Sequence, residues 1–186
     1  MTSRAALPAL TLIAACLLPA AANAQTVPTK AGLWASASQV VLNGKAMPTI
    51  FDIRGVPDAK KTQLRQAMAQ AGLPAGWNPS LDCQTETQVD LQAMMAKMQA
   101  DGCTPKITSN TGNRITGTMD CTADGTKGHG TVEVTGIGST SVTYLMTMTG
   151  TINGAPMTYK ATTVSRYIGA DCSQLPPGVD ADMLNH

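Results

Sequence analysis

Cysteines are the residues of this chain whose chemistry is easiest to interpret. Cys16 lies in an apolar N-terminal stretch, and the other four are Cys83, Cys103, Cys121 and Cys172. An even number of cysteines in an exported chain is typical of disulfide bonds. No Cys-x-x-Cys motif occurs, and the separations of 20, 18 and 51 residues fit no zinc-binding pattern. We therefore predict two disulfides and no metal site.

A predicted β-hairpin pairs two of these cysteines. The turn is Thr111-Gly112-Asn113, one strand begins at Cys103, and the other strand ends at Cys121. A three-residue loop favours a left-handed residue at its end, and asparagine tolerates that conformation. This register sets Asn110 opposite Arg114 and Cys103 opposite Cys121. Directly opposed residues lie close enough for a disulfide.

The second bridge, Cys83–Cys172, follows by elimination and ties the middle of the chain to its end. Loop-entropy arguments give about 3 kcal/mol of stabilisation for the shorter bridge and about 4–5 kcal/mol for the longer one. Removal of the Cys83–Cys172 bridge is therefore expected to destabilise the fold more.

Residues that could perform catalysis are few. His129 lies between two glycines, and Asp124 and Glu133 are near enough in sequence to partner it as a general base. A histidine in a turn is the simpler interpretation. The chain has no GxSxG nucleophile motif and no phosphate-binding or dinucleotide-binding glycine pattern. We therefore predict no catalytic residue, no cofactor and no enzymatic activity.

Methionine is unusually frequent, with 11 residues in the chain. Flexible methionines can fill gaps in a core that has few aromatic side chains, or they can line a pliable pocket for an apolar ligand. Their thioethers could also bind Cu(I) in an oxidising compartment. The pocket candidates are Met94, Met95 and Met98 on one face of a predicted helix, and Met146 and Met148 on one face of a predicted strand.

The overall composition excludes several classes of protein. Charged residues make up 13% of the chain and the formal net charge is +1, so no basic excess is available to grip nucleic acid. A hydrophobic fraction of 43% is too high for a disordered chain. With only two histidines, a histidine-rich metal centre is excluded as well.

Residues 1–24 are predicted to be a signal peptide. Arg4 precedes an apolar stretch, and Ala22-Asn23-Ala24 is a small-x-small cleavage site. An alternative is lipid anchoring, because Ile13-Ala14-Ala15-Cys16 resembles a bacterial lipobox. Residues 25–186 contain no second long apolar run, which indicates one periplasmic domain without a transmembrane span.

The first half of this domain is expected to contain a hairpin and then two helices. Asn43-Gly44 joins strands over Leu33–Leu42 and Lys45–Ile53. The register places Trp34, Val40, Met47, Phe51 and Ile53 on one face. Helical spacing predicts a helix over 58–71, then a loop over 73–80, then a helix capped by Thr87 and stopped by Gly102.

The second half is expected to contain only strands. Asn153-Gly154 is another strong hairpin turn, and it sets Met148 opposite Tyr159 and Met146 opposite Ala161. The sum is an α+β fold with an antiparallel meander of about seven strands, and a curved or half-barrel sheet is one form that it can take. Two amphipathic helices are inserted after the first hairpin.

Several short motifs resemble the domain of unknown function 3617 family of small exported bacterial proteins. They are Gly32-Leu33-Trp34, Cys83-Gln84-Thr85-Glu86 before a helix, the Cys103 and Cys121 pair, and Arg166-Tyr167-Ile168-Gly169 before Cys172. The resemblance spans nearly all of residues 25–186. It implies a periplasmic location and no established activity, so it supplies no catalytic residues.

The function expected from the sequence is therefore a non-enzymatic binding or interaction module in the periplasm. A carrier that holds a lipid or another apolar ligand in a methionine-lined pocket is the first alternative. Cu(I) binding by the methionines is the second. The sequence identifies neither the ligand nor a partner.

Overall fold

The computed structural model describes residues 26–123 and 125–173, which form ten strands, two α-helices and a short 3-10 helix. The predicted signal peptide, 1–24, and the alternative lipid-anchor residue, Cys16, lie outside the described residues. In chain order the elements are β1 (Thr26–Pro28), β2 (Gly32–Leu42), β3 (Lys45–Ala46), η1 (Ile50–Asp52), α1 (Asp58–Gln70), β4 (Asn78–Gln84), β5 (Gln88–Asp90), α2 (Leu91–Ala100), β6 (Cys103–Asn110), β7 (Arg114–Ala123), β8 (Thr126–Thr135), β9 (Ser141–Ile152) and β10 (Ala155–Gly169).

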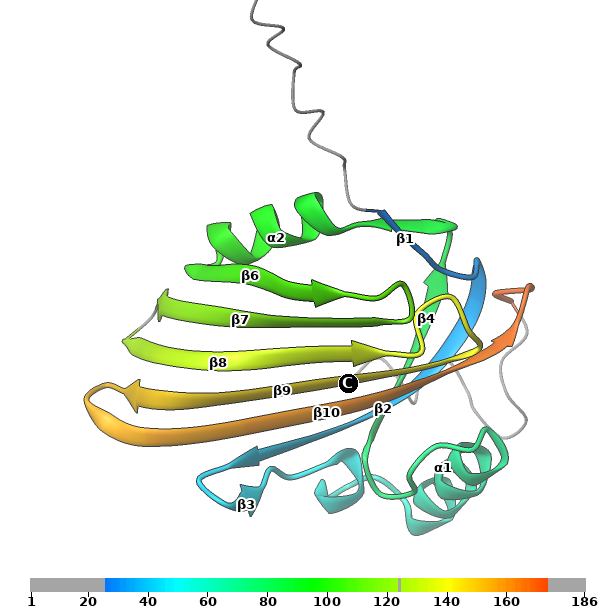
Figure 1. The fold of residues 1–186 in the computed structure, drawn as a ribbon. Helices are drawn as coiled ribbons and strands as arrows, with labels where there is room; N and C mark the ends of the chain where they lie inside the picture. Colours follow the sequence, from blue (N-terminus) through cyan, green and yellow to red (C-terminus); the bar gives the residue numbers. More distant parts are fainter. Residues whose placement is uncertain (1–25, 124, 174–186) are drawn as a thin grey trace, which may run out of the picture.

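The main sheet is antiparallel and contains the order β3-β2-β10-β9-β8-β7-β6, with β4 paired to β2 as its eighth strand (Figure 1). The α+β fold and the meander are therefore as the sequence predicts. Strand β2 shares one of its edges between two partners, because β4 pairs with its first half and β3 with its last two residues. Strands β1 and β5 form a separate two-stranded sheet.

The sheet is open and is not strongly curled, so the half-barrel form is not found (Figure 1). Closure of a barrel requires hydrogen bonds between its two edge strands. Within the described residues, β3 pairs only with β2 and β6 pairs only with β7. Strand β3 has just two residues, which is too short to continue the ladder.

The first hairpin has the predicted turn but not the predicted second strand. Asn43 and Gly44 have φ values of 50° and 77°, as a two-residue turn of this type requires. The second strand ends at Ala46 instead of Ile53, because Pro48 cannot donate a ladder hydrogen bond. Thr49 then caps the short 3-10 helix through its side chain.

The predicted common face of this hairpin is consequently wrong. Phe51 is buried under α1, while Met47 and Ile53 are 44% and 49% exposed. Trp34 pairs with Asp82 of β4 and with Tyr167 of β10.

Three strands were not expected from the sequence: β1, β4 and β5. Strand β4 overlaps the predicted loop over 73–80, and it carries Pro79 at the edge of the sheet, where proline is tolerated. Strand β5 covers the residues where the second helix was expected to begin. Helix α2 instead starts at Leu91, because Asp90 accepts hydrogen bonds from the backbone N–H groups of Gln92 and Ala93.

The two disulfides have the pairing that the sequence predicts, Cys103–Cys121 and Cys83–Cys172. Cys103 and Cys121 are opposite each other in the β6–β7 ladder, with Cα atoms 4.0 Å apart. The register shifts by one residue between Ile107 and Ser109, so the predicted Asn110–Arg114 pairing is wrong. The bulge lies between the cysteines and the turn and therefore leaves the bridge in place.

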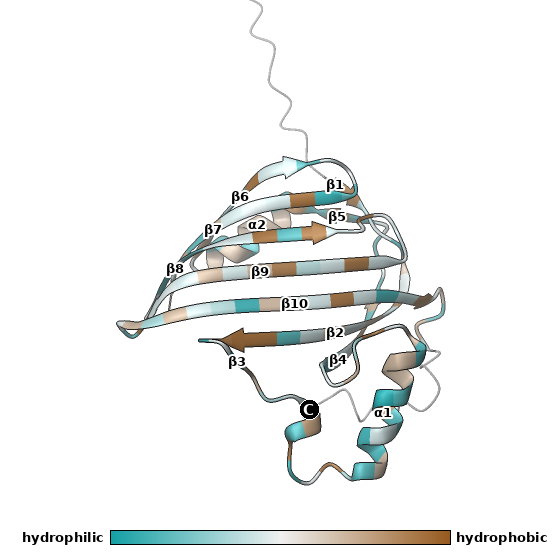
Figure 2. Cartoon of the chain, turned by 60° about the horizontal axis from the view of Figure 1, so that its bottom comes forward, coloured by the Kyte–Doolittle hydropathy of each residue, from teal (hydrophilic) through white to brown (hydrophobic). Residues whose placement is uncertain are grey.

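Helices α1 and α2 cover opposite faces at opposite ends of the sheet. Alternation along the strands, seen as bands along β9 and β10 in Figure 2, sends Ala35 toward α1 and Trp34 to the other face. The core under α1 includes Ala37, Leu64 and Met68. The core on the α2 side consists of two clusters: Met119, Cys121, Met148 and Met157, and Val27, Leu91 and Ile115.

Candidate functional site

A cavity of about 340 Å³ lies between α2 and the inner face of the sheet. This volume is within the ~300–1,000 Å³ range of small-molecule sites. Its roof is α2, its floor is formed by β6 to β9, and Val27, Pro28 and Thr29 close one side. Most of the lining side chains are aliphatic or thioether groups, so the cavity suits an apolar occupant.

The floor follows from the alternation of β7, β8 and β9. Ile115, Val132 and Val134 occupy inward positions and line the cavity. Gly117 also lines it, and a Cβ atom there would lie 2.8 Å from the carbonyl oxygen of Lys106 and 3.3 Å from Val132 Cγ1. Glycine therefore permits the close approach of β6 to β7 and leaves the floor without a side chain at this point.

The roof carries three of the five methionines that the sequence singles out. Met94, Met95 and Met98 line the cavity, and Met94 is 46% exposed. Leu91 anchors the start of α2, because it is buried against Val27 and Ile115. The Cys103–Cys121 disulfide holds the chain just after its end.

The other two predicted pocket residues lie beside the cavity rather than in its wall. Met148 is buried in the cluster with Met119, Cys121 and Met157, and Met146 packs against that cluster. Met119, which was not among the predicted pocket residues, belongs to both this cluster and the cavity wall. Its inward position on β7 was readable from strand alternation.

Tyr144 is the ionisable aromatic residue of the floor. Its hydroxyl group donates to Met146 Sδ at 3.4 Å. Burial raises the pKa of this phenol above 10.0, and the nearby Tyr159 raises it further. Tyr144 is therefore neutral at physiological pH and adds no charge to the cavity.

His129 is paired with a carboxylate, but not with either of the two that the sequence suggested. Its Nδ1 atom is 2.7 Å from Asp120 Oδ1, and the two side chains are 62% and 68% exposed. Asp120 is directly opposite His129 in the β7–β8 ladder. The sequence pointed to Glu133 or Asp124 as the partner, but Glu133 pairs elsewhere and Asp124 lies outside the described residues.

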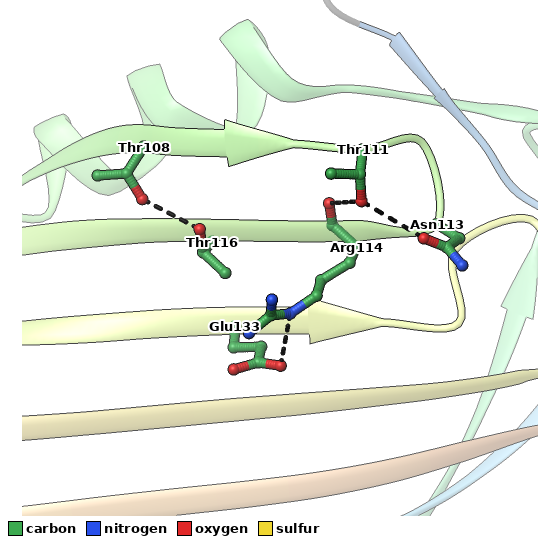
Figure 3. Close-up of polar contacts among 6 residues, drawn as sticks. All are labelled: Thr108, Thr111, Asn113, Arg114, Thr116 and Glu133. Atoms are coloured by element: carbon green, nitrogen blue, oxygen red, sulfur yellow. Dashed lines mark hydrogen bonds and ion pairs between the residues drawn. The ribbon is translucent and has the colours of Figure 1, made fainter.

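The partner of Glu133 is Arg114, whose Nε donates to Glu133 Oε1 at 2.8 Å (Figure 3). This hydrogen bond lowers the pKa of the glutamate and raises that of the arginine. Hydroxyl pairs such as Thr108–Thr116 surround it on the polar face of β6 to β8. These interactions stabilise a solvated surface of the sheet.

In residues 26–123 and 125–173, no group of three or more histidine, cysteine, aspartate or glutamate side chains is placed to hold a metal ion. Over the same residues, neither α1 nor α2 is long and apolar enough to cross a membrane.

Comparisons with known proteins agree with the resemblance noted in the sequence. A family model described as "Protein of unknown function (DUF3617)" matches residues 29–172. The chain is also 29% identical over 87 residues to a Pseudomonas putida protein described as "Uncharacterized protein in lpd-3 5'region". That alignment covers 44% of this chain and 61% of the relative, less than two thirds of the relative's length. No solved structure matches.

Proposed function

We propose that this chain, which belongs to the DUF3617 family, is a non-enzymatic binding protein for an apolar ligand. The ligand is held between α2 and the sheet. The observation that carries this proposal is the 340 Å³ cavity with its aliphatic and thioether lining. A hydrocarbon chain is the occupant that such walls favour, because every buried methylene contributes about 0.8 kcal/mol.

The α2 methionines support an adaptable site. Unbranched thioether side chains change rotamer easily, and methionine-rich surfaces accommodate more than one apolar shape. Met94 is partly exposed, so the roof has a flexible apolar side chain at the solvent boundary. A ligand can therefore be covered without a large movement of the helix.

The compartment is also part of the proposal. The two disulfides indicate an oxidising location outside the cytoplasm. Cleavage after residue 24 and release into the periplasm would place the protein where free lipids and other apolar molecules need a carrier.

Native mass spectrometry of protein purified gently from the periplasm tests the proposal. We expect a co-purified mass, and we expect the delipidated protein to take up the fluorescent apolar probe N-phenyl-1-naphthylamine. An apo mass together with no probe uptake would overturn the proposal.

Enzymatic activity is tested separately. Purified protein should not hydrolyse a panel of esters, phosphates and glycosides. Turnover that disappears in a His129→Ala variant would contradict the non-enzymatic assignment.

A further inference from the structure

A second hollow, of about 200 Å³, adjoins the apolar cavity on the same face of the sheet. The two hollows share Thr29, Trp34 and Val142 in their walls. The second one lies toward β2, β4 and β10, whereas the cavity lies under α2. A molecule longer than the cavity therefore has a continuous place in which to extend.

The lining changes from apolar to polar between the two hollows. Ser36 and Ser165 face each other across β2 and β10, and their hydroxyl oxygens are 2.7 Å apart. Asp82 and Gln84 of β4 complete this wall. In the part of the chain that the structure describes, the Asp82 carboxylate has no hydrogen-bond or ion-pair partner, so both its oxygens are available as acceptors.

A positive charge, that of Lys30, lies close to the residues of this wall. The Lys30 ammonium group lies 4.0 Å from the centroid of the Tyr167 ring, and Tyr167 packs edge-on against Trp34. The indole N–H of Trp34 donates to the carbonyl oxygen of Lys30 at 2.8 Å. Asp82 is thus the charged residue in the wall of the hollow, and Lys30 lies behind the wall, where it contacts Trp34 and Tyr167.

We propose that the two hollows bind one amphipathic molecule, with its hydrocarbon chain under α2 and an uncharged, hydroxyl-bearing head beside Asp82. This inference rests on the proposed function and specifies the class of ligand. A hydroxyl group donates to the free carboxylate and accepts from the one serine hydroxyl that is not donating to the other serine. An anionic head would be repelled by Asp82, and the attraction of a cationic head to Asp82 would be opposed by the positive charge of Lys30 behind the wall.

Trp34 makes the proposal measurable because it borders both hollows and is 7% exposed. The other tryptophan, Trp77, packs against the core under α1. In a Trp77→Phe variant, Trp34 is the only tryptophan, so its fluorescence emission reports whether the hollows are occupied.

The experiment compares three twelve-carbon amphiphiles below their micelle concentrations, in the oxidised Trp77→Phe protein. They are monolauroylglycerol, laurate and dodecylammonium. We expect monolauroylglycerol to bind about tenfold more tightly than either charged amphiphile. A factor of this size corresponds to one hydrogen bond from the hydroxyl group to the Asp82 carboxylate. In an Asp82→Asn variant the preference over laurate should fall by about tenfold. The matched control is Asp120→Asn, an exposed carboxylate on the opposite face of the sheet, which should leave the preference unchanged.

The outcomes separate the two proposals. No uptake of N-phenyl-1-naphthylamine and no amphiphile binding would overturn the cavity itself. The head-group assignment alone would be overturned if the probe is taken up but the three amphiphiles bind equally, or if a charged one binds more tightly. It would also be overturned if the Asp82→Asn variant keeps the preference of the parent protein. Monolauroylglycerol preference that depends on Asp82 supports both.

Discussion

Filling the floor of the cavity should shorten the hydrocarbon chain that the protein can hold. Val134 lines the cavity between Ile115 and Tyr144 on the neighbouring strands. A Val134→Phe substitution adds four carbon atoms at this position. With a water-sized group occupying ~30 Å³, the 340 Å³ cavity holds about ten groups, so the substitution removes room for roughly four methylenes.

The magnitude follows from the burial of those methylenes. At about 0.8 kcal/mol each, affinity in the parent protein should rise about fourfold per added methylene until the cavity is full. In Val134→Phe the affinity should stop rising at a chain length about four carbons shorter than in the parent protein. Long chains should then lose about 3 kcal/mol, on the order of 100-fold in Kd, while short chains lose little.

The assay is displacement of N-phenyl-1-naphthylamine by an alcohol series of increasing chain length. The matched control is Leu145→Phe, which adds an aromatic ring to β9 at a position that alternates with Tyr144 and Met146 and so points to the opposite face. Thermal unfolding checks that both variants fold. A chain-length profile that is flat in the parent protein, or identical in Val134→Phe, would refute the placement of the chain in this cavity.

Three further expectations concern the disulfides, the Arg114–Glu133 ion pair and the α2 methionines. The disulfides close separations of 18 and 89 residues. Replacing the Cys103–Cys121 pair by alanine should lower the free energy of unfolding by about 3 kcal/mol, and replacing the Cys83–Cys172 pair should lower it by about 4.6 kcal/mol. A larger loss for the Cys103–Cys121 pair in urea unfolding would contradict this order. The hydrogen bond from Arg114 lowers the pKa of Glu133 below 4.5, so its stabilisation is present at neutral pH and is lost as pH falls through the folded-state value. The melting temperature of Glu133→Gln should therefore lie below that of the parent at pH 7 and meet it in acid; a constant difference would be inconsistent with the ion pair. Leucine in place of the three α2 methionines keeps the apolar packing but removes the sulfur, so probe uptake should persist within a few-fold; its loss together with loss of Cu(I) binding would favour the copper alternative.

Local signals in the sequence were sufficient for the two Asn-Gly turns and for the Cys103–Cys121 disulfide, whereas the Cys83–Cys172 pairing followed only by elimination. Asn43-Gly44 and Asn153-Gly154 both adopt the positive φ values that their turn type requires. Cys103 and Cys121 fall opposite each other because only a short turn and one bulge separate them. In each case the pairing partners are close in sequence, so register propagates from the turn.

The elements that sequence reasoning missed depend on distant partners. Strand β4 pairs with β2, forty or more residues earlier in the chain, and its Asn78-Pro79 start is typical of a loop. Strand β5 is paired only with β1 among the described residues. Neither strand has the alternating pattern that identifies an isolated strand, because tertiary pairing rather than local preference determines both.

The cavity was only partly predictable for a different reason. An apolar stripe such as Met94, Met95 and Met98 has the same pattern whether it packs in a core or faces a void. The difference is made by what is absent opposite the stripe, where Gly117 has no side chain and Val132 is small. A void of this kind can be identified only when α2 and the strands are assembled in three dimensions.

The contrast between the two faces of the sheet supports an evolved cavity rather than poor packing. The core under α1 contains the chain's one phenylalanine, Phe51, and a gap in this core measures about 20 Å³, the size of a single water molecule. Protein interiors are close-packed and contain few voids larger than a water molecule, so an apolar cavity of about 340 Å³ is a departure from ordinary packing. The two disulfides together contribute about 8 kcal/mol in the loop-entropy model, so the oxidised chain can keep the α2 side open while the α1 side supplies the close-packed core.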